Sequence, residues 1–342
     1  MVAIHGRTGQ AAEQGESGIR PFDIGRDLRP VARLIAQAFA DELDEKGRAA
    51  LRELRLMSYM GGLMRLLSRS TSEFRDIFNG FVWVENGQLV GNVTIQKADS
   101  RGYRWQIANV AVAPAYRGRG ISRALMERAL GHIQEMGGAW AVLQVRENNR
   151  VARGLYERLG FENLGGHTKM VASQAPTGVP FPQMEGLIPM PASQGRLLYE
   201  LATSQPHPEI HWWRAPRRSQ FQVTLEQQLG EWLNRLVGRQ AVLRRAVQHF
   251  PDRYEAALVL TARRWQPPHE MQLWVRPEQQ GKLERPLIQW ALAALQEHPR
   301  WPVQITLSTV DQAARQVLEE YGFQEEYTLL TMRRSVKLAT DI

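Results

Sequence analysis

The stretch from residue 109 to residue 161 constrains the fold of this chain more than any other part of it. Its first half reads NVAVAPAYRGRGISRALMERALGHI, a strand pattern followed by a basic turn with two glycines and an amphipathic helix pattern. Its second half reads AVLQVRENNRVARGLYERLGF, which is another strand, a polar turn and a second helix. Two strand–turn–helix units in direct succession indicate an α/β fold.

The turn of the first unit has the composition of a phosphate-binding site. It consists of Arg117, Gly118, Arg119, Gly120, Ile121 and Ser122. The first N–H groups of a helix have no intrahelical partner and lie at the positive end of the helix dipole, so they attract anions. Glycine allows positive φ angles and a close approach of phosphate, while arginine adds charge and bidentate hydrogen bonds. The turn therefore predicts a pyrophosphate site, with an ordinary basic loop as the alternative.

Both units together resemble the GNAT superfamily of acetyl-CoA-dependent N-acetyltransferases. The family's pyrophosphate pattern, Arg/Gln-x-x-Gly-x-Gly/Ala, is matched by Arg117, Gly120 and Ser122, with serine in place of the last small residue. The second signature, Asn-x-x-Ala-x-x-Leu-Tyr followed by Gly-Phe, is matched by Asn149, Ala152, Leu155, Tyr156, Gly160 and Phe161. The resemblance implies a mixed, mostly antiparallel central sheet flanked by helices, with a splayed central strand pair.

The resemblance also implies how acetyl-CoA is bound as a co-substrate. Backbone groups of Val110, Ala111 and Val112 would hold its pantetheine arm, and one of their N–H groups would stabilise the oxyanion of the thioester. Residues 117–122 would hold the pyrophosphate, and Asn149 would contact the pantetheine region.

Tyr156 would protonate the departing thiolate as a general acid, and its alternative role is packing against the sheet. The attacking amine must also lose a proton, for which relatives often supply a carboxylate from one of two strand positions. This chain has Gln106 and Gln144 at those positions, and glutamine cannot act as a base. Glu147 is a nearby carboxylate that we interpret as a solvated charge. The sequence thus identifies no general base, and a water chain or an acceptor amine of lowered pKa would serve instead.

The composition of the chain excludes several kinds of site and of protein. The chain has 342 residues and no cysteine, which excludes disulfides, thiolate metal sites and cysteine nucleophiles. Its 8 histidines show no metal-ligand spacing, and no apolar run approaches the roughly 20 residues needed to cross a membrane. Residues 1–18 lack the apolar segment of a signal peptide. We therefore expect a cytoplasmic protein whose site holds no metal.

The net charge of +8 raises the possibility of nucleic-acid binding. The arginines are spread along helices instead of forming one stripe, and the cluster at 212–218 is interpreted as a strand edge or a domain contact. The sequence therefore favours an active N-acetyltransferase over a non-catalytic acyl-CoA-binding sensor or scaffold, and both over a nucleic-acid-binding protein.

The N-terminal part adds further elements of the same fold. The sequence predicts a strand at 19–22, a helix at 27–39 and a second helix at about 47–69. The methionine-rich part of the second helix is assigned to core packing, with a role in the acceptor pocket as the alternative. Asn86 and Gly87 lie between two alternating apolar runs and predict a β-hairpin.

The pattern of the first half returns, in weaker form, in the second half. The strand and turn at 273–282 match those at 110–119, because Val275 corresponds to Val112 and Gln280 to Arg117 (275 − 112 = 163 and 280 − 117 = 163). The string at 311–323 then matches 149–161.

The second copy has lost what the chemistry needs. Leu283 replaces Gly120, Leu318 replaces Tyr156, and Asp311 replaces Asn149. We predict a disordered tail at 1–18, a catalytic domain at 19–172, a linker at 173–194 and a degenerate GNAT-like domain at 195–342. The expected reaction is direct transfer of an acetyl group from acetyl-CoA to a primary amine of a small molecule, an amino acid or a protein N-terminus. The identity of the acceptor, the role of the second domain and the oligomeric state are left open.

Overall fold

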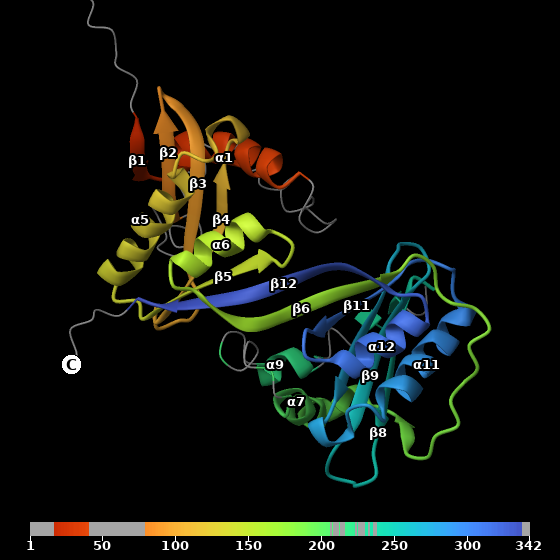
Figure 1. The fold of residues 1–342 in the computed structure, drawn as a ribbon. Coiled ribbons are helices and arrows are strands. Elements are labelled where there is room, and N and C mark those ends of the chain that lie inside the picture. Colours follow the sequence, from red (N-terminus) through yellow and green to blue (C-terminus); the bar gives the residue numbers. More distant parts are fainter. Residues whose placement is uncertain are drawn as a thin grey trace, which may run out of the picture. The chain divides into compact units, whose positions relative to one another are not determined.

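The structure is a computed structural model that describes residues 17–40, 79–205, 216–222 and 238–336, together with a few other positions between 206 and 237 (Figure 1). The helix predicted at 47–69 lies outside the described residues, as does almost all of the predicted tail at 1–18. Trp213 and Arg214 of the basic-aromatic cluster at 212–218 lie outside them too, whereas Arg217 and Arg218 are described and stand at the start of a short helix.

The chain forms two compact units. Unit 1 comprises Met1–Leu143, Leu159–Phe161 and Arg333–Ile342, and unit 2 comprises Gln144–Arg158 and Glu162–Met332. These units reflect internal contacts, whereas the predicted domain bounds reflect the sequence repeat. The bounds 19–172 and 195–342 therefore stay a prediction.

Unit 1 is built on a sheet with the strand order β1-β2-β3-β4-β5. These strands are β1 (Gly18–Pro21), β2 (Asn79–Glu85), β3 (Gln88–Lys97), β4 (Arg104–Val112) and β5 (Trp140–Arg146). The successive pairs from β1 to β4 are antiparallel, and β4 pairs in parallel with β5. The predicted hairpin is confirmed, because Asn86 and Gly87 join β2 to β3 with φ angles of 50° and 77°. Two successive positive φ angles are what a two-residue hairpin turn of type I′ requires.

Two described helices cover this sheet. Helix α1 (Ile24–Ala38) begins at Asp23, whose carboxylate accepts hydrogen bonds from the N–H groups of Gly25 and Arg26 at 2.8 and 3.1 Å. Helix α5 (Ile121–Glu135) follows the predicted phosphate turn and buries Leu125, Met126, Ala129 and Ile133 completely. The apolar face predicted for this helix is therefore its core face.

In unit 2 the strand order is β12-β6-β11-β10-β9-β8-β7. Its strands are β6 (Glu162–Ala172), β7 (Leu187–Pro189), β8 (Gln240–Val247), β9 (Ala256–Arg263), β10 (His269–Val275), β11 (Val303–Ser308) and β12 (Gln324–Ser335), whose last residues belong to unit 1. Its helices are α6 (Arg150–Arg158), α7 (Gly195–Thr203), α9 (Arg218–Phe221), α11 (Glu284–Ala294) and α12 (Gln312–Glu320). The β10–β11 pair is parallel, and the pairs β6–β11, β9–β10, β8–β9 and β7–β8 are antiparallel.

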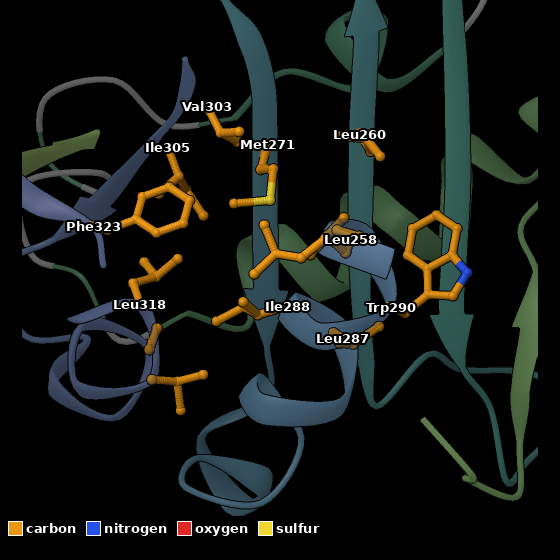
Figure 2. Close-up of a cluster of buried hydrophobic side chains, with 14 of the residues drawn as sticks. Leu258, Leu260, Met271, Leu287, Ile288, Trp290, Val303, Ile305, Leu318 and Phe323 are labelled. Atoms are coloured by element: carbon orange, nitrogen blue, oxygen red, sulfur yellow. The ribbon is translucent and has the colours of Figure 1, made fainter. Parts of the chain in front are cut away.

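The main core of unit 2 lies between α11 and the strands β9 to β11. Figure 2 shows Leu287 and Ile288 of α11 pointing toward Leu258 and Met271, and all four side chains are at most 2% exposed. Side chains of this kind contribute about 1.5–3 kcal/mol each when fully buried. The core thus holds α11 against β9 and β10, and β10 is the strand that carries the repeated motif.

Within the described residues, each unit has a parallel strand pair that separates along its length. The β4–β5 pairing runs only from Arg104↔Trp140 to Gln106↔Val142, although β4 continues to Val112. The β10–β11 pairing likewise covers only the first three residues of β10. The fold is therefore the predicted mixed, mostly antiparallel α/β arrangement with two copies of the splayed strand pair.

Candidate cofactor and active site

The end of β4 is shaped by a bulge next to the splayed pair. The β3–β4 register shifts between Asn92 and Thr94, opposite Asn109, which has a φ angle of 51°. Asparagine tolerates this left-handed conformation better than most residues. The buried amide of Asn92 donates a 2.9 Å hydrogen bond to the carbonyl oxygen of Asn109 and so holds the bulge in place. Bulges re-aim the residues that follow them, here the predicted pantetheine strand at 110–112.

The predicted pyrophosphate turn follows directly. A short 3₁₀ turn, η1 (Pro114–Tyr116), leads to Arg117, whose Nε donates to the carbonyl oxygen of Val112 at 3.2 Å. Gly118 and Gly120 have φ angles of 78° and 80°, and space is open where a Cβ would lie at either position. The glycines are thus required by backbone conformation and not by crowding inside the protein.

The start of α5 is free to receive an anion. Gly120 is its N-cap, no described side chain caps the helix there, and its first turn contains no acidic residue. Arg119 is exposed, and its guanidinium lies 5.0 Å from the ring centre of Tyr116, beside the same turn. Unit 1 therefore brings the predicted residues 110–122 together around one exposed helix N-terminus with a positive surrounding.

Asn149 and Tyr156 lie in unit 2. Asn149 directly precedes α6, and Tyr156 lies within this helix. The Oδ1 atom of Asn149 accepts a 3.1 Å hydrogen bond from the N–H of Ala152, which makes Asn149 the cap of the helix. Tyr156 is 7% exposed and is the one buried residue of α6. The capping role of Asn149 was not predicted from the sequence. The cofactor contact predicted for Asn149 and the acid role predicted for Tyr156 stay predictions.

Gln106 and Gln144, the two glutamines predicted to stand where relatives carry a base, both have polar side-chain neighbours. Gln96 donates to the Oε1 atom of Gln106 at 2.9 Å, and the two residues face each other on β3 and β4. Gln144, near the end of β5, lies 3.4 Å from the hydroxyl of buried Thr331 on β12.

A groove that sequence reasoning missed adjoins the start of α6. Its volume is about 560 Å³, and it is lined by Glu147, Asn148, Arg150 and Arg153 on one side and by Glu325, Glu326, Tyr327 and Thr328 on the other. The N–H of Glu147 donates to the carbonyl oxygen of Thr328 at 2.9 Å, and the guanidinium of Arg146 lies 3.9 Å from the ring centre of Tyr327. Residues from the far C-terminal part of the chain therefore form one wall beside the second signature.

The second copy has the same backbone conformation as the first turn until Leu283, the counterpart of Gly120. The 3₁₀ turn η3 (Pro277–Gln279) lies 163 positions after η1, and Gly281 has a φ angle of 82°, close to the 78° of its counterpart Gly118. Leu283, the counterpart of Gly120, instead has φ −104° and ψ −12°. The two copies therefore diverge where a left-handed glycine would open the helix N-terminus.

Among the described residues, no helix is both long and apolar enough to cross a bilayer. Within the same residues, no group of three or more histidine, aspartate and glutamate side chains is arranged to hold a metal ion.

Comparison with known proteins agrees with the motifs. The family described as "Acetyltransferase (GNAT) family" matches residues 48–161. N-alpha-acetyltransferase MAK3 of Arabidopsis thaliana is 31% identical over 137 residues, which cover 35% of this chain and 72% of that protein. Mycothiol acetyltransferase of Thermobifida fusca is 30% identical over 167 residues, which cover 45% of each chain. The chain thus spans less than half the length of this second relative.

Solved structures show the same fold over nearly the whole chain. A GCN5-related N-acetyltransferase from Sphaerobacter thermophilus has a TM-score of 0.59 at 15% identity, covering 95% of this chain and 98% of that one. A tandem GNAT protein from the clavulanic acid biosynthesis pathway has a TM-score of 0.54 at 14% identity, covering 95% of this chain and all of that one. With its two signatures, its splayed strand pairs and these relatives, the chain belongs to the GNAT family of acetyltransferases, in a tandem form.

Proposed function

We propose that this chain is an acetyl-CoA-dependent N-acetyltransferase with one active centre, formed by its first copy of the motif. The observation that carries the proposal is the difference between the two turns. Gly118 and Gly120 leave the start of α5 open and exposed, whereas Leu283 has a right-handed conformation at the matching position. Only the first copy combines this open N-terminus with the arginines at 117 and 119 and with a tyrosine at 156.

In the proposed reaction the acceptor nitrogen attacks the carbonyl carbon of the thioester, a C–N bond forms, and the C–S bond breaks. The backbone N–H groups at 110–112 stabilise the oxyanion, because β4 is no longer paired with β5 there. Tyr156 gives its phenolic proton to the departing thiolate, and the proton of the attacking amine leaves through water. No covalent acyl-enzyme on cysteine forms, since the chain contains no cysteine.

The acceptor is proposed only as a class, a primary amine. Relatives named for mycothiol and for N-alpha acetylation match at 30% and 31% identity, so similarity does not favour either acceptor. The proposal includes a cytoplasmic location and a site without metal. A non-catalytic acyl-CoA sensor is the second candidate, and the observation that favours it is glutamine at both positions 106 and 144.

The proposal is tested by calorimetric titration with acetyl-CoA of the wild type and of matched glycine variants. Gly118→Leu and Gly120→Leu should abolish binding, because leucine is strained at these φ angles and would block the approach of the pyrophosphate. Gly281→Leu is the control, since Gly281 has nearly the same φ angle and equally open surroundings in the second copy. Binding should be followed by thiol release with a panel of amines. Acetyl-CoA binding without turnover of any amine would favour the sensor, and absence of binding would exclude both candidates.

A further inference from the structure

A small cavity in unit 2 occupies the position of a cofactor site in the second copy. Its lining residues are Gln205, Leu273, Val275, Gln280, Glu284, Leu307, Asp311 and Ala314. Five of them are the repeat counterparts of predicted cofactor-binding residues in the first copy, namely Val110, Val112, Arg117, Ile121 and Asn149. These repeated positions therefore converge on a single cavity, and all of them lie within unit 2.

The carboxylate of Glu284 lies where the first copy would bind pyrophosphate. Glu284 is the first residue of α11 and is 3% exposed. Its Oε1 atom accepts a 3.0 Å hydrogen bond from the N–H of Gly281, the counterpart of Gly118. A carboxylate in the first turn of a helix interacts favourably with the helix dipole, as a bound phosphate would.

The side-chain amide of Gln205 lies where the first copy would bind pantetheine. Gln205 is 5% exposed, and its Nε2 atom donates to the carbonyl oxygen of Val275 at 2.9 Å. Val275 is the last residue of β10, beyond the point where β10 stops pairing with β11. The amide therefore makes a hydrogen bond to the strand of the kind that an amide of the pantetheine arm would make.

A third polar group closes the site near α12. His207 is 3% exposed, and its Nε2 atom lies 3.5 Å from the carboxylate of Asp311, the N-cap residue of α12. Asp311 is the counterpart of Asn149. The segment that carries Gln205 and His207 thus reaches both the strand side and the helix side of the same site.

Little space remains inside. The cavity volume is about 20 Å³, which is enough for one water molecule but far below the roughly 300–1,000 Å³ of ordinary ligand pockets. The Oε2 atom of Glu284 is buried and has no hydrogen-bond partner among the described residues, so it offers an acceptor to such a water.

We propose that the second copy is an internally liganded cofactor site, in which Gln205 and Glu284 take the places of pantetheine and pyrophosphate. The proposal rests on the proposed function, because it takes acetyl-CoA as the ligand of the first copy. The chain then binds one acetyl-CoA, and the second copy keeps its structure without cofactor. In this copy, which no longer binds cofactor, the protein's own side chains thus take the place of the ligand.

Hydrogen–deuterium exchange with and without saturating acetyl-CoA tests the first consequence on the full chain. Acetyl-CoA should slow exchange at 110–122 and leave exchange at 273–284 unchanged. Ligand-dependent protection at 273–284, or a second equivalent of acetyl-CoA in calorimetry, would overturn the proposal. If no acetyl-CoA binds at all, the proposed function fails, and the occupancy of the second site is decided by the variants below.

The double variant Gln205→Ala/Glu284→Ala tests the occupants themselves without any added ligand. Losing two buried hydrogen bonds should speed amide exchange at 277–287 by about tenfold or more. The control is Glu278→Ala, which removes an exposed carboxylate from the same turn and should exchange like the wild type. Wild-type exchange in the double variant would show that the two side chains do not hold the site. Should circular dichroism show that the double variant is unfolded, Gln205→Ala alone replaces it, with the same two outcomes.

Discussion

The side-chain amide of Gln96 donates a 2.9 Å hydrogen bond to the Oε1 atom of Gln106 on the adjacent strand. Gln106 is predicted to stand at one of the positions where GNAT relatives often place a carboxylate, and its amide is hydrogen-bonded to a second amide. Gln144, at the other position, is close to a threonine hydroxyl. Neither amide can take a proton from the ammonium form of the acceptor, so the protonation state of the acceptor itself should control the rate.

The first prediction concerns the pH dependence of turnover. For two acceptor amines of different pKa, kcat/KM should rise about tenfold per pH unit and level off at the pKa of each amine, because only the neutral amine attacks. Thiol release measured from pH 6.5 to 10 checks this. If kcat/KM levels off at the same pH for both amines, a base of the enzyme controls the rate. Gln106→Glu supplies a carboxylate at this position and should raise the rate at the acidic end.

The second prediction concerns Tyr156. Tyr156→Phe should lower kcat by about 10²–10⁴-fold, the usual contribution of a general acid, and change the Kd of acetyl-CoA by less than about threefold. Steady-state kinetics and calorimetry measure the two quantities. Tyr103→Phe is the control, since Tyr103 is 56% exposed. An unchanged kcat would leave Tyr156 with a packing role only.

The features that sequence could predict are those encoded within a few residues. Asn86 and Gly87 form the expected hairpin because both tolerate positive φ angles. Gly118 and Gly281 share a left-handed conformation 163 positions apart, so the repeat is visible both in sequence and in backbone geometry. Local chemistry determines these features, so they can be predicted without knowing which distant residues are in contact.

The features that escaped prediction depend on contacts between distant parts of the chain. Thr331 approaches Gln144 across 187 positions, and Gln205 reaches Val275 across 70 positions. A period-2 strand pattern says which face of β12 is buried but not which strand lies beside it. The groove beside α6 and the occupied second site both follow from such pairings, so neither could be found from the motifs alone.

The third prediction concerns a buried ion pair of unit 1. Arg20 donates to both oxygens of Asp27 at 2.5 and 2.7 Å, and the Asp27 side chain is 2% exposed. Asp27→Asn should lower the free energy of unfolding by about 3 kcal/mol, because it removes the negative charge that pairs with a largely buried guanidinium. Urea denaturation followed by circular dichroism measures this. Glu127→Gln, which breaks an exposed pair with Arg123, should cost at most about 0.5 kcal/mol. Equal effects of the two variants would contradict the argument.

The fourth prediction concerns stability in acid. His269 is fully buried, its Nδ1 atom accepts from the N–H of Arg263 at 3.0 Å, and its Nε2 atom lies 2.9 Å from the carbonyl oxygen of Pro299. Burial lowers the pKa of His269, so the folded state favours the neutral ring. Between that lowered pKa and the unfolded value of about 6.5 the unfolded chain binds more protons, and stability therefore falls as the pH falls through this window.

Urea denaturation at pH 7.5 and pH 5.5 measures this loss. In His269→Asn the difference between the two pH values should shrink, although the variant is less stable at both. His132→Asn is the control, because His132 is partly exposed. A pH dependence that His269→Asn leaves unchanged would assign the effect to other groups.

The last prediction separates two roles of Asn149. Its Oδ1 atom caps α6 through the N–H of Ala152, and the same residue is predicted to contact the pantetheine arm. Asn149→Asp keeps a good capping oxygen and should leave the free energy of unfolding within about 0.5 kcal/mol of the wild type, whereas Asn149→Ala should lower it by about 1 kcal/mol. Both variants should weaken acetyl-CoA binding if the contact exists, and aspartate should do so more strongly through its negative charge. If Asn149→Asp binds acetyl-CoA as the wild type does, Asn149 serves the helix and not the cofactor.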